Sequence, residues 1–159
     1  MDITAFLPPI GTLLTGVVVA VISARLTVRY ALKRFYSEKW WERKVAAYSS
    51  IIEALHHVRN YADTNIQFSQ RGKNLPEEGD KQLTEKLQNA MGELRKQWDM
   101  GNFIISDKAV EALNTLMQEL ENSTRNVTWD THLMLKLEAV DNCLSSMRRI
   151  ARTDLNLFA

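Results

Sequence analysis

The sequence has few of the residues that cross-link chains or interrupt helices. It contains a single cysteine, Cys143, among 159 residues, which excludes an internal disulfide and gives no indication of an oxidising compartment. We expect this thiol to be a small buried side chain in a helix. The chain has only three prolines and six glycines, and none of them lies between Gly16 and Gly72. Because Gly and Pro are the usual helix breakers, residues 17–71 have the composition of one long helix.

The sequence motifs of common enzyme classes are also missing. There is no glycine-rich phosphate loop, Walker pattern or dinucleotide pattern, and no Gly-x-Ser-x-Gly motif. His56 and His57 are adjacent, so on a helix they point about 100° apart and cannot clasp one metal ion. Glu53 and His56 have the Glu-x-x-His spacing of di-iron bundles, but a second copy is absent. We therefore expect no enzyme activity, no metal and no cofactor.

Charge is nearly balanced overall but unevenly distributed. The net charge is +1, which argues against a general nucleic-acid-binding protein. Residues 25–44 hold seven basic and two acidic side chains, whereas residues 45–159 hold 13 basic and 16 acidic ones. The basic run is interleaved with aromatics, as in single-strand nucleic-acid binders. An adjacent membrane explains the same charges, so we expect a lipid bilayer and no nucleic acid as the partner of this segment.

One long apolar run precedes the basic segment. Residues 3–24 carry no charge, and about 20 such residues in a helix cross the hydrocarbon core. A cleaved secretory signal would have positive charge before the run, but here Asp2 precedes it and every base follows it. A signal peptide and a buried helix of a soluble protein are the weaker alternatives. We predict a single-pass anchor over residues 1–24, with the N-terminus outside and the C-terminal domain cytoplasmic.

One face of the predicted anchor carries small side chains. Thr12, Gly16, Ala20 and Ala24 follow one another at intervals of four residues. Such a stripe lets two helices approach closely in lipid, where packing drives association. It predicts self-association through the membrane helix.

The segment after the anchor has two possible courses. In a straight helix Trp41 would stand about 25 Å beyond Ala24, too far for an interfacial aromatic belt, whereas Tyr30 at about 9 Å fits one. The alternative bends the chain near residues 25–36 and lays 29–44 on anionic lipid. That course needs a kink, and the sequence offers no Pro or Gly to make it. We therefore favour the straight helix.

Residues 25–44 form the predicted basic and aromatic juxtamembrane helix. Its exposed bases and rings would contact lipid headgroups, a partner subunit or a neighbouring helix. The residues predicted for this membrane-proximal contact are Arg25, Arg29, Tyr30, Lys33, Arg34, Tyr36 and Trp40.

Residues 45–159 are predicted to form a cytoplasmic antiparallel bundle of about four helices, so the fold class is all-α. Its first helix extends the anchor, and the others cover about 80–100, 107–122 and 129–152. Asp80, Ser106 or Asp107, and Thr128 or Asp130 are candidate N-caps, and Gly101 is a stop signal.

The apolar period assigns an inward face to each helix. Phe103 and Ile104, in the connector GNFIIS, are expected to tuck under the bundle. The inward positions are Trp41, Val45, Tyr48, Ile52, Leu55, Ala62 and Ile66; Leu83, Leu87, Met91, Leu94 and Trp98; Val110, Leu113, Met117 and Leu120; and Leu133, Leu137, Val140, Leu144, Met147 and Ala151.

The stretch KRFYSEKWWERKVAAYSSIIEAL, placed just after a single span, resembles small uncharacterised single-span inner-membrane proteins of bacteria. The connector GNFIIS followed by a helix fits the same likeness, which covers about half the chain. The resemblance implies an inner-membrane location, and it assigns neither an activity nor site residues.

The sequence favours a membrane-anchored adaptor or scaffold that self-associates or docks a membrane protein partner at the cytoplasmic face. An alternative is an oligomerising effector that perturbs the membrane, such as a toxin or a defence component. An accessory subunit of a transporter or channel is a third hypothesis.

Overall fold

The protein is all-α in the part of the chain that the structure describes. A computed structural model describes the backbone of residues 7–122 and 128–156, and the side chains of these residues except 7–19, 21 and 102. No strand occurs among them. The elements are α1 (Leu7–Gln70), α2 (Glu77–Met100), the short 3₁₀ helix η2 (Gly101–Phe103), α3 (Asp107–Asn122) and α4 (Trp129–Asp154).

The chain divides into two compact units, residues 1–41 and residues 42–159. The first unit contains the N-terminal part of α1. The second contains the remainder of α1 with the other helices, which form a helical bundle around one apolar core. The predicted four-helix bundle is therefore confirmed.

Helix α1 is long because nothing in its sequence stops it before Gly72. The backbone is helical throughout residues 25–36, where the bent alternative needs an interruption. The helix ends in a Schellman motif, with Gly72 at a φ of 62°. The amide of Gly72 donates to the carbonyl of Ser69 at 2.9 Å, and that of Lys73 donates to the carbonyl of Phe68 at 3.1 Å. Glycine adopts this left-handed conformation without steric cost.

The core begins one turn later along α1 than the sequence predicts. Trp41 is 49% exposed and lies outside the core, so its assignment to the inward face is wrong. Tyr48, Leu55 and Ala62 are buried as predicted, whereas Val45, Ile52 and Ile66 are only half-buried. The observed face is broader and rotated. Its buried members are Ala47, Tyr48, Ile51, Ala54, Leu55, Val58 and Ala62.

Helix α2 starts earlier than predicted and ends where predicted. Pro76, not Asp80, occupies the N-cap position, with φ −56° and ψ 140°, because a proline loses no needed amide there. Glu77 opens an acidic first turn that suits the positive end of the helix dipole. Gly101, at a φ of 39°, terminates the helix.

Two aromatic side chains predicted to face the core lie outside it and are exposed. Trp98 of α2 is 40% exposed, and Gln97 is buried beside it. Phe103 is 69% exposed because η2 turns it outward, and Ile105 takes the buried position in this connector. Ile104 is half-buried and packs against the core as expected.

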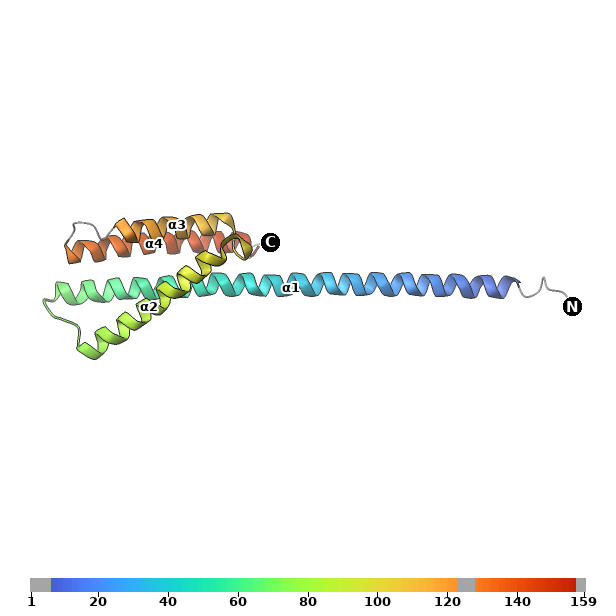
Figure 1. The fold of residues 1–159 in the computed structure, drawn as a ribbon, viewed down its shortest axis with the longest axis horizontal. Coiled ribbons are helices and arrows are strands. Elements are labelled where there is room, and N and C mark those ends of the chain that lie inside the picture. Colours follow the sequence, from blue (N-terminus) through green and yellow to red (C-terminus); the bar gives the residue numbers. More distant parts are fainter. Residues whose placement is uncertain (1–6, 123–127, 157–159) are drawn as a thin grey trace. The chain divides into compact units, whose positions relative to one another are not determined.

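Helices α3 and α4 lie side by side, and α2 runs obliquely to them (Figure 1). Thr128 caps α4, since its hydroxyl oxygen accepts from the amide of Thr131 at 3.4 Å. Among the predicted inward positions, Leu113 and Leu133 are fully buried, whereas others are half-buried because each helix presents more than one face to its neighbours. The half-buried ones are Val110, Met117, Leu120 and Leu137.

In the described residues no helix contains an apolar stretch long enough to cross a membrane. The predicted span falls mostly on residues 1–19 and 21, whose side chains lie outside the described part of the chain.

Candidate functional site

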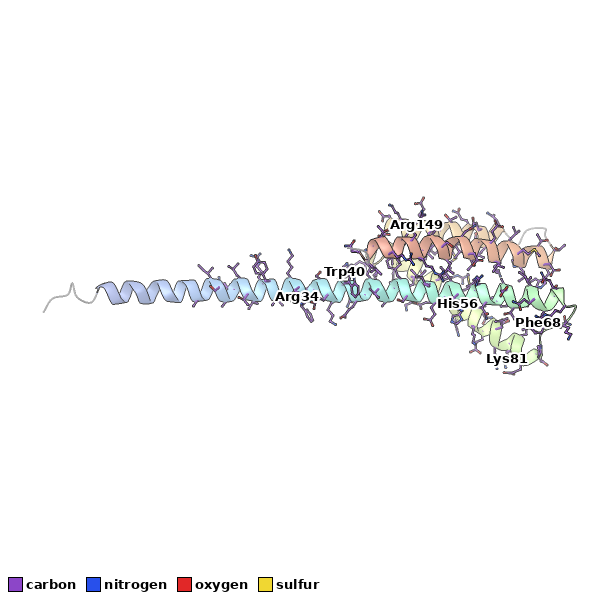
Figure 2. The ribbon with its side chains drawn as sticks, turned by 180° about the vertical axis from the view of Figure 1, so that it is seen from behind. Arg34, Trp40, His56, Phe68, Lys81 and Arg149 are labelled. Carbon is purple, nitrogen blue, oxygen red and sulfur yellow. The ribbon has the colours of Figure 1, made fainter. Side chains whose placement is uncertain are left out.

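The predicted contact segment is helical and exposed along its whole length. Every described side chain from residue 22 to residue 43 is exposed, including apolar ones that globular proteins usually bury. Tyr30 is 72% exposed, Tyr36 66% and Trp40 44%. The side chains of Arg34 and Trp40 are labelled along this part of α1 in Figure 2. The other exposed large apolar side chains of this segment are Ile22, Leu26, Val28, Leu32, Phe35 and Trp41.

The charges of this segment fall into two groups. Arg25, Arg29 and Lys33, which we call the basic ladder, are each four residues apart and so line up along one face of α1. Arg34 lies about 100° from Lys33 around the helix, and its Nε donates to Oε1 of Glu38 at 2.8 Å. This hydrogen bond raises the pKa of Arg34 above its ordinary value. The ladder has no such carboxylate partner among the described residues.

The predicted small-residue stripe is only partly described. Ala20 and Ala24 are exposed on α1. Thr12 and Gly16 lie outside the residues whose side chains are described. Self-association through this stripe stays a prediction.

One end of the bundle is closed by a polar junction that the sequence did not predict. The junction consists of Lys44, Tyr48, Ser106 and Asp154. Tyr48 donates its hydroxyl to Oδ2 of Asp154. Its oxygen lies 3.3 Å from the hydroxyl of Ser106 and accepts from the Ser106 amide, also at 3.3 Å. Lys44 Nζ lies 3.7 Å from Asp154 Oδ2. No local pattern could identify this junction, since its members are up to 110 positions apart.

Electrostatics at the polar junction favour the charged carboxylate. Burial alone would raise the pKa of Asp154, but hydrogen bonds from Tyr48 and Ser106 and the charge of Lys44 hold this pKa below its ordinary value. Burial, followed by the hydrogen bond to Asp154, raises the pKa of Tyr48. The junction is thus a neutral phenol bound to an ionised carboxylate, which joins α1 to the end of α4.

Glu93 links α2 to α1 in a second polar group. Its Oε1 accepts from Ser50 Oγ and from Gln97 Nε2, both at 2.7 Å. Lys96 Nζ lies 3.3 Å from Oε2. The hydrogen bond from Gln97, then that from Ser50, holds the pKa of Glu93 below its ordinary value. These bonds explain why the amide of Gln97 is tolerated in a buried position.

Two contacts that involve charged side chains link α1 to α4. Arg59 Nε donates to Asp141 Oδ1 at 2.6 Å. The ammonium of Lys136 lies 5.5 Å from the ring centre of Tyr61, within the range of a cation–π contact. Burial lowers the pKa of Lys136. These contacts hold the two helices in register.

Grooves follow the seam between α3 and α4. One of them has a volume of about 830 Å³ and contains both acidic and basic side chains, such as Glu111 and Arg149. Cys143 lines a smaller neighbouring cleft of about 140 Å³. Burial raises the pKa of its thiol to about 12, so the thiol stays protonated and is a poor nucleophile at neutral pH. Cys143 is therefore a buried packing residue, as predicted.

The three histidines lie on α1 and α4. In the described residues no group of three or more His, Cys, Asp or Glu side chains is arranged to hold a metal ion. His56 is exposed and its ring lies 6.1 Å from that of His57. The rings of Trp129 and His132 lie 5.8 Å apart at the start of α4.

Compared with known proteins, the chain matches no protein-family model, no curated protein and no solved structure.

Proposed function

We propose that this protein is a membrane-anchored helical adaptor or scaffold. Residues 3–24 form a single span in the inner membrane, and the bundle lies at the cytoplasmic face, where it self-associates or docks a membrane protein partner. The bilayer, rather than nucleic acid, is the partner of the segment that joins them. The observation that carries the proposal is the exposure of apolar, aromatic and basic side chains all round α1 from residue 22 to residue 43.

The exposure of these apolar side chains is unfavourable for a helix surrounded by water. A helix that shows large apolar side chains on every side has no face suited to water, so an isolated soluble helix of this composition is unfavourable. A bilayer beside it covers the apolar residues nearest the span, such as Ile22 and Leu26, and its headgroup layer suits bases and Tyr30. The uncharged run of residues 3–24 supplies the length that a span needs.

The bundle supports an adaptor role through its surface. Several of its polar groups pair with one another across helices, as at the polar junction and at Glu93. They therefore hold a fixed arrangement of helices. Trp129 and Met134 of α4, each more than half exposed, offer apolar area for a docked partner.

Membrane integration is tested first with full-length protein expressed in bacteria. Leu14→Arg with Val18→Arg places two charges in the proposed span and should release the protein from carbonate-washed membranes. Leu14→Ile with Val18→Leu is the matched control and should remain integrated. A double-arginine variant that stays in the washed membrane would contradict the proposed span. A C-terminal fluorescent reporter that fails to fluoresce while a phosphatase reporter is active would contradict the topology.

The adaptor role is tested by purification in mild detergent after cross-linking in cells. We expect a defined oligomer or a reproducible membrane protein partner identified by mass spectrometry. Expression of the intact chain should leave the membrane potential unchanged. Growth arrest with depolarisation, abolished by the double-arginine variant, would instead indicate the membrane-perturbing effector.

A further inference from the structure

The basic ladder is an unusual arrangement for a helix in water. Arg25, Arg29 and Lys33 are neighbours along one face, about 6 Å apart in successive turns, and like charges at this spacing repel one another. None of the three bonds to a carboxylate among the described residues. The next base, Arg34, is bound to Glu38 at 2.8 Å. The segment thus leaves its first three bases unneutralised and pairs the fourth.

The basic ladder also lies in a stretch of α1 that contains no acidic residue. The ladder covers about 12 Å of helix, directly after Ala24. After the uncharged run, the first acidic residues are Glu38 and Glu42, which follow the ladder. No acid therefore offsets the ladder in the turns adjacent to the proposed span. A second copy of the chain would bring the same positive charge and does not relieve the repulsion.

We propose that the basic ladder binds the phosphate groups of anionic phospholipids at the inner face of the membrane. This inference rests on the proposed membrane anchor, because the chain then places Arg25 at the headgroup layer and Lys33 about a Debye length beyond it. Arginine binds phosphate oxygens in a bidentate manner, and lysine adds a point charge. Tyr30, 72% exposed in the same turns, supplies an aromatic ring at headgroup depth.

The test uses full-length protein reconstituted into phosphatidylcholine bilayers that contain either spin-labelled phosphatidylglycerol or spin-labelled phosphatidylcholine. Electron paramagnetic resonance then measures the fraction of each labelled lipid that the protein immobilises. We expect phosphatidylglycerol to associate about fivefold more strongly than phosphatidylcholine. The preference should fall toward unity in 0.5 M salt, since screening shortens the reach of these charges.

The decisive variant is Arg25→Gln, Arg29→Gln and Lys33→Gln together, which should abolish the preference. Arg43→Gln is the control, because this exposed base lies about 15 Å beyond Lys33 along the helix and its loss should leave the preference within about twofold. Lys33→Gln alone removes one of the three charges of the ladder and should reduce the preference more than Arg43→Gln. Far-UV circular dichroism confirms that each variant remains helical.

The outcomes separate the inference from the proposed function. A protein that immobilises neither lipid and is released by carbonate contradicts the anchor. An integrated protein with equal affinity for both lipids contradicts the basic ladder alone, and points to an acidic protein surface as the occupant. A preference that survives the triple substitution contradicts the ladder as well.

Discussion

Tyr48 and Asp154 are 106 residues apart in the chain, and the phenolic hydroxyl of the first donates to the carboxylate of the second. Tyr48 is only 1% exposed, so this bond is made in the interior of the bundle. It joins the beginning of the bundle's first helix to the end of its last. The stability of this end therefore depends on a polar contact between the two extremes of the bundle.

Tyr48→Phe should destabilise the bundle by about 1–3 kcal/mol, because it leaves Asp154 and Ser106 without their buried partner. Chemical unfolding of the full-length protein in mild detergent, followed by circular dichroism, measures the change. Tyr36→Phe is the matched control, and its free energy of unfolding should stay within about 0.5 kcal/mol of the original. Equal effects of the two substitutions would contradict the structural role of the polar junction.

Acid should weaken the polar junction through Asp154. Its pKa is lower in the folded protein than the ordinary value of 3.8, so the folded state favours the charged carboxylate. The resulting stability is present above 3.8 and is lost as the pH falls through the lower folded value. Asp154→Asn removes this component. The stability difference between the original protein and Asp154→Asn should therefore narrow between pH 5 and pH 2, and a constant difference over that range would contradict the prediction.

Truncation in the core should cost far more than truncation at the surface. Leu113 is fully buried, so Leu113→Ala removes apolar contacts and leaves a cavity, at about 2–5 kcal/mol. Leu135 is 41% exposed, and Leu135→Ala should cost less than about 1 kcal/mol. Unfolding curves of the two variants under the same conditions compare them directly. Similar costs would show that α3 is not part of the core.

The thiol of Cys143 should react slowly in the folded protein. It is 6% exposed with a pKa of about 12, so both access and thiolate content are low. Maleimide labelling at pH 7.5, followed by mass spectrometry, should be slowed at least about 100-fold relative to protein in denaturant. The exposed position Ser145, changed to Cys in a Cys143→Ala background, is the control and should label rapidly. Comparable rates at the two positions would contradict the burial.

Self-association through the span is tested at the small-residue stripe. Gly16→Leu with Ala20→Leu should reduce cross-linking of the full-length protein, because bulky side chains keep two helices apart in lipid. Val17→Leu with Val21→Leu changes bulk at neighbouring positions and is the matched control. If the control and the stripe variant cross-link equally well, the contact lies in the bundle instead.

Local sequence signals located most helix boundaries. Gly101 ends α2, Thr128 caps α4, and α3 covers the predicted residues 107–122. The start of α2 was predicted three residues late, because Pro76 was taken for loop and Asp80 for the cap. These features depend on residues within one turn of each other, so the chain determines them before any helix packs. The apolar period likewise determined that the protein is all-α, and the single cysteine was expected to be a buried side chain, as Cys143 is.

Tertiary structure decided which sides of the helices are covered and which distant polar groups meet. Trp41 and Trp98 fit the helical period of their neighbours but stay 49% and 40% exposed, since burial depends on how far a neighbouring helix covers each side chain. The indole N–H of Trp98 donates to Asn114 Oδ1 of α3, yet the ring remains outside the core. Ile51 and Val58 are buried for the same reason, because α1 is covered over a wider arc than one periodic stripe. The partnership of Tyr48 with Asp154 exists only once both ends of the bundle have come together, and no sequence period encodes a contact of that span.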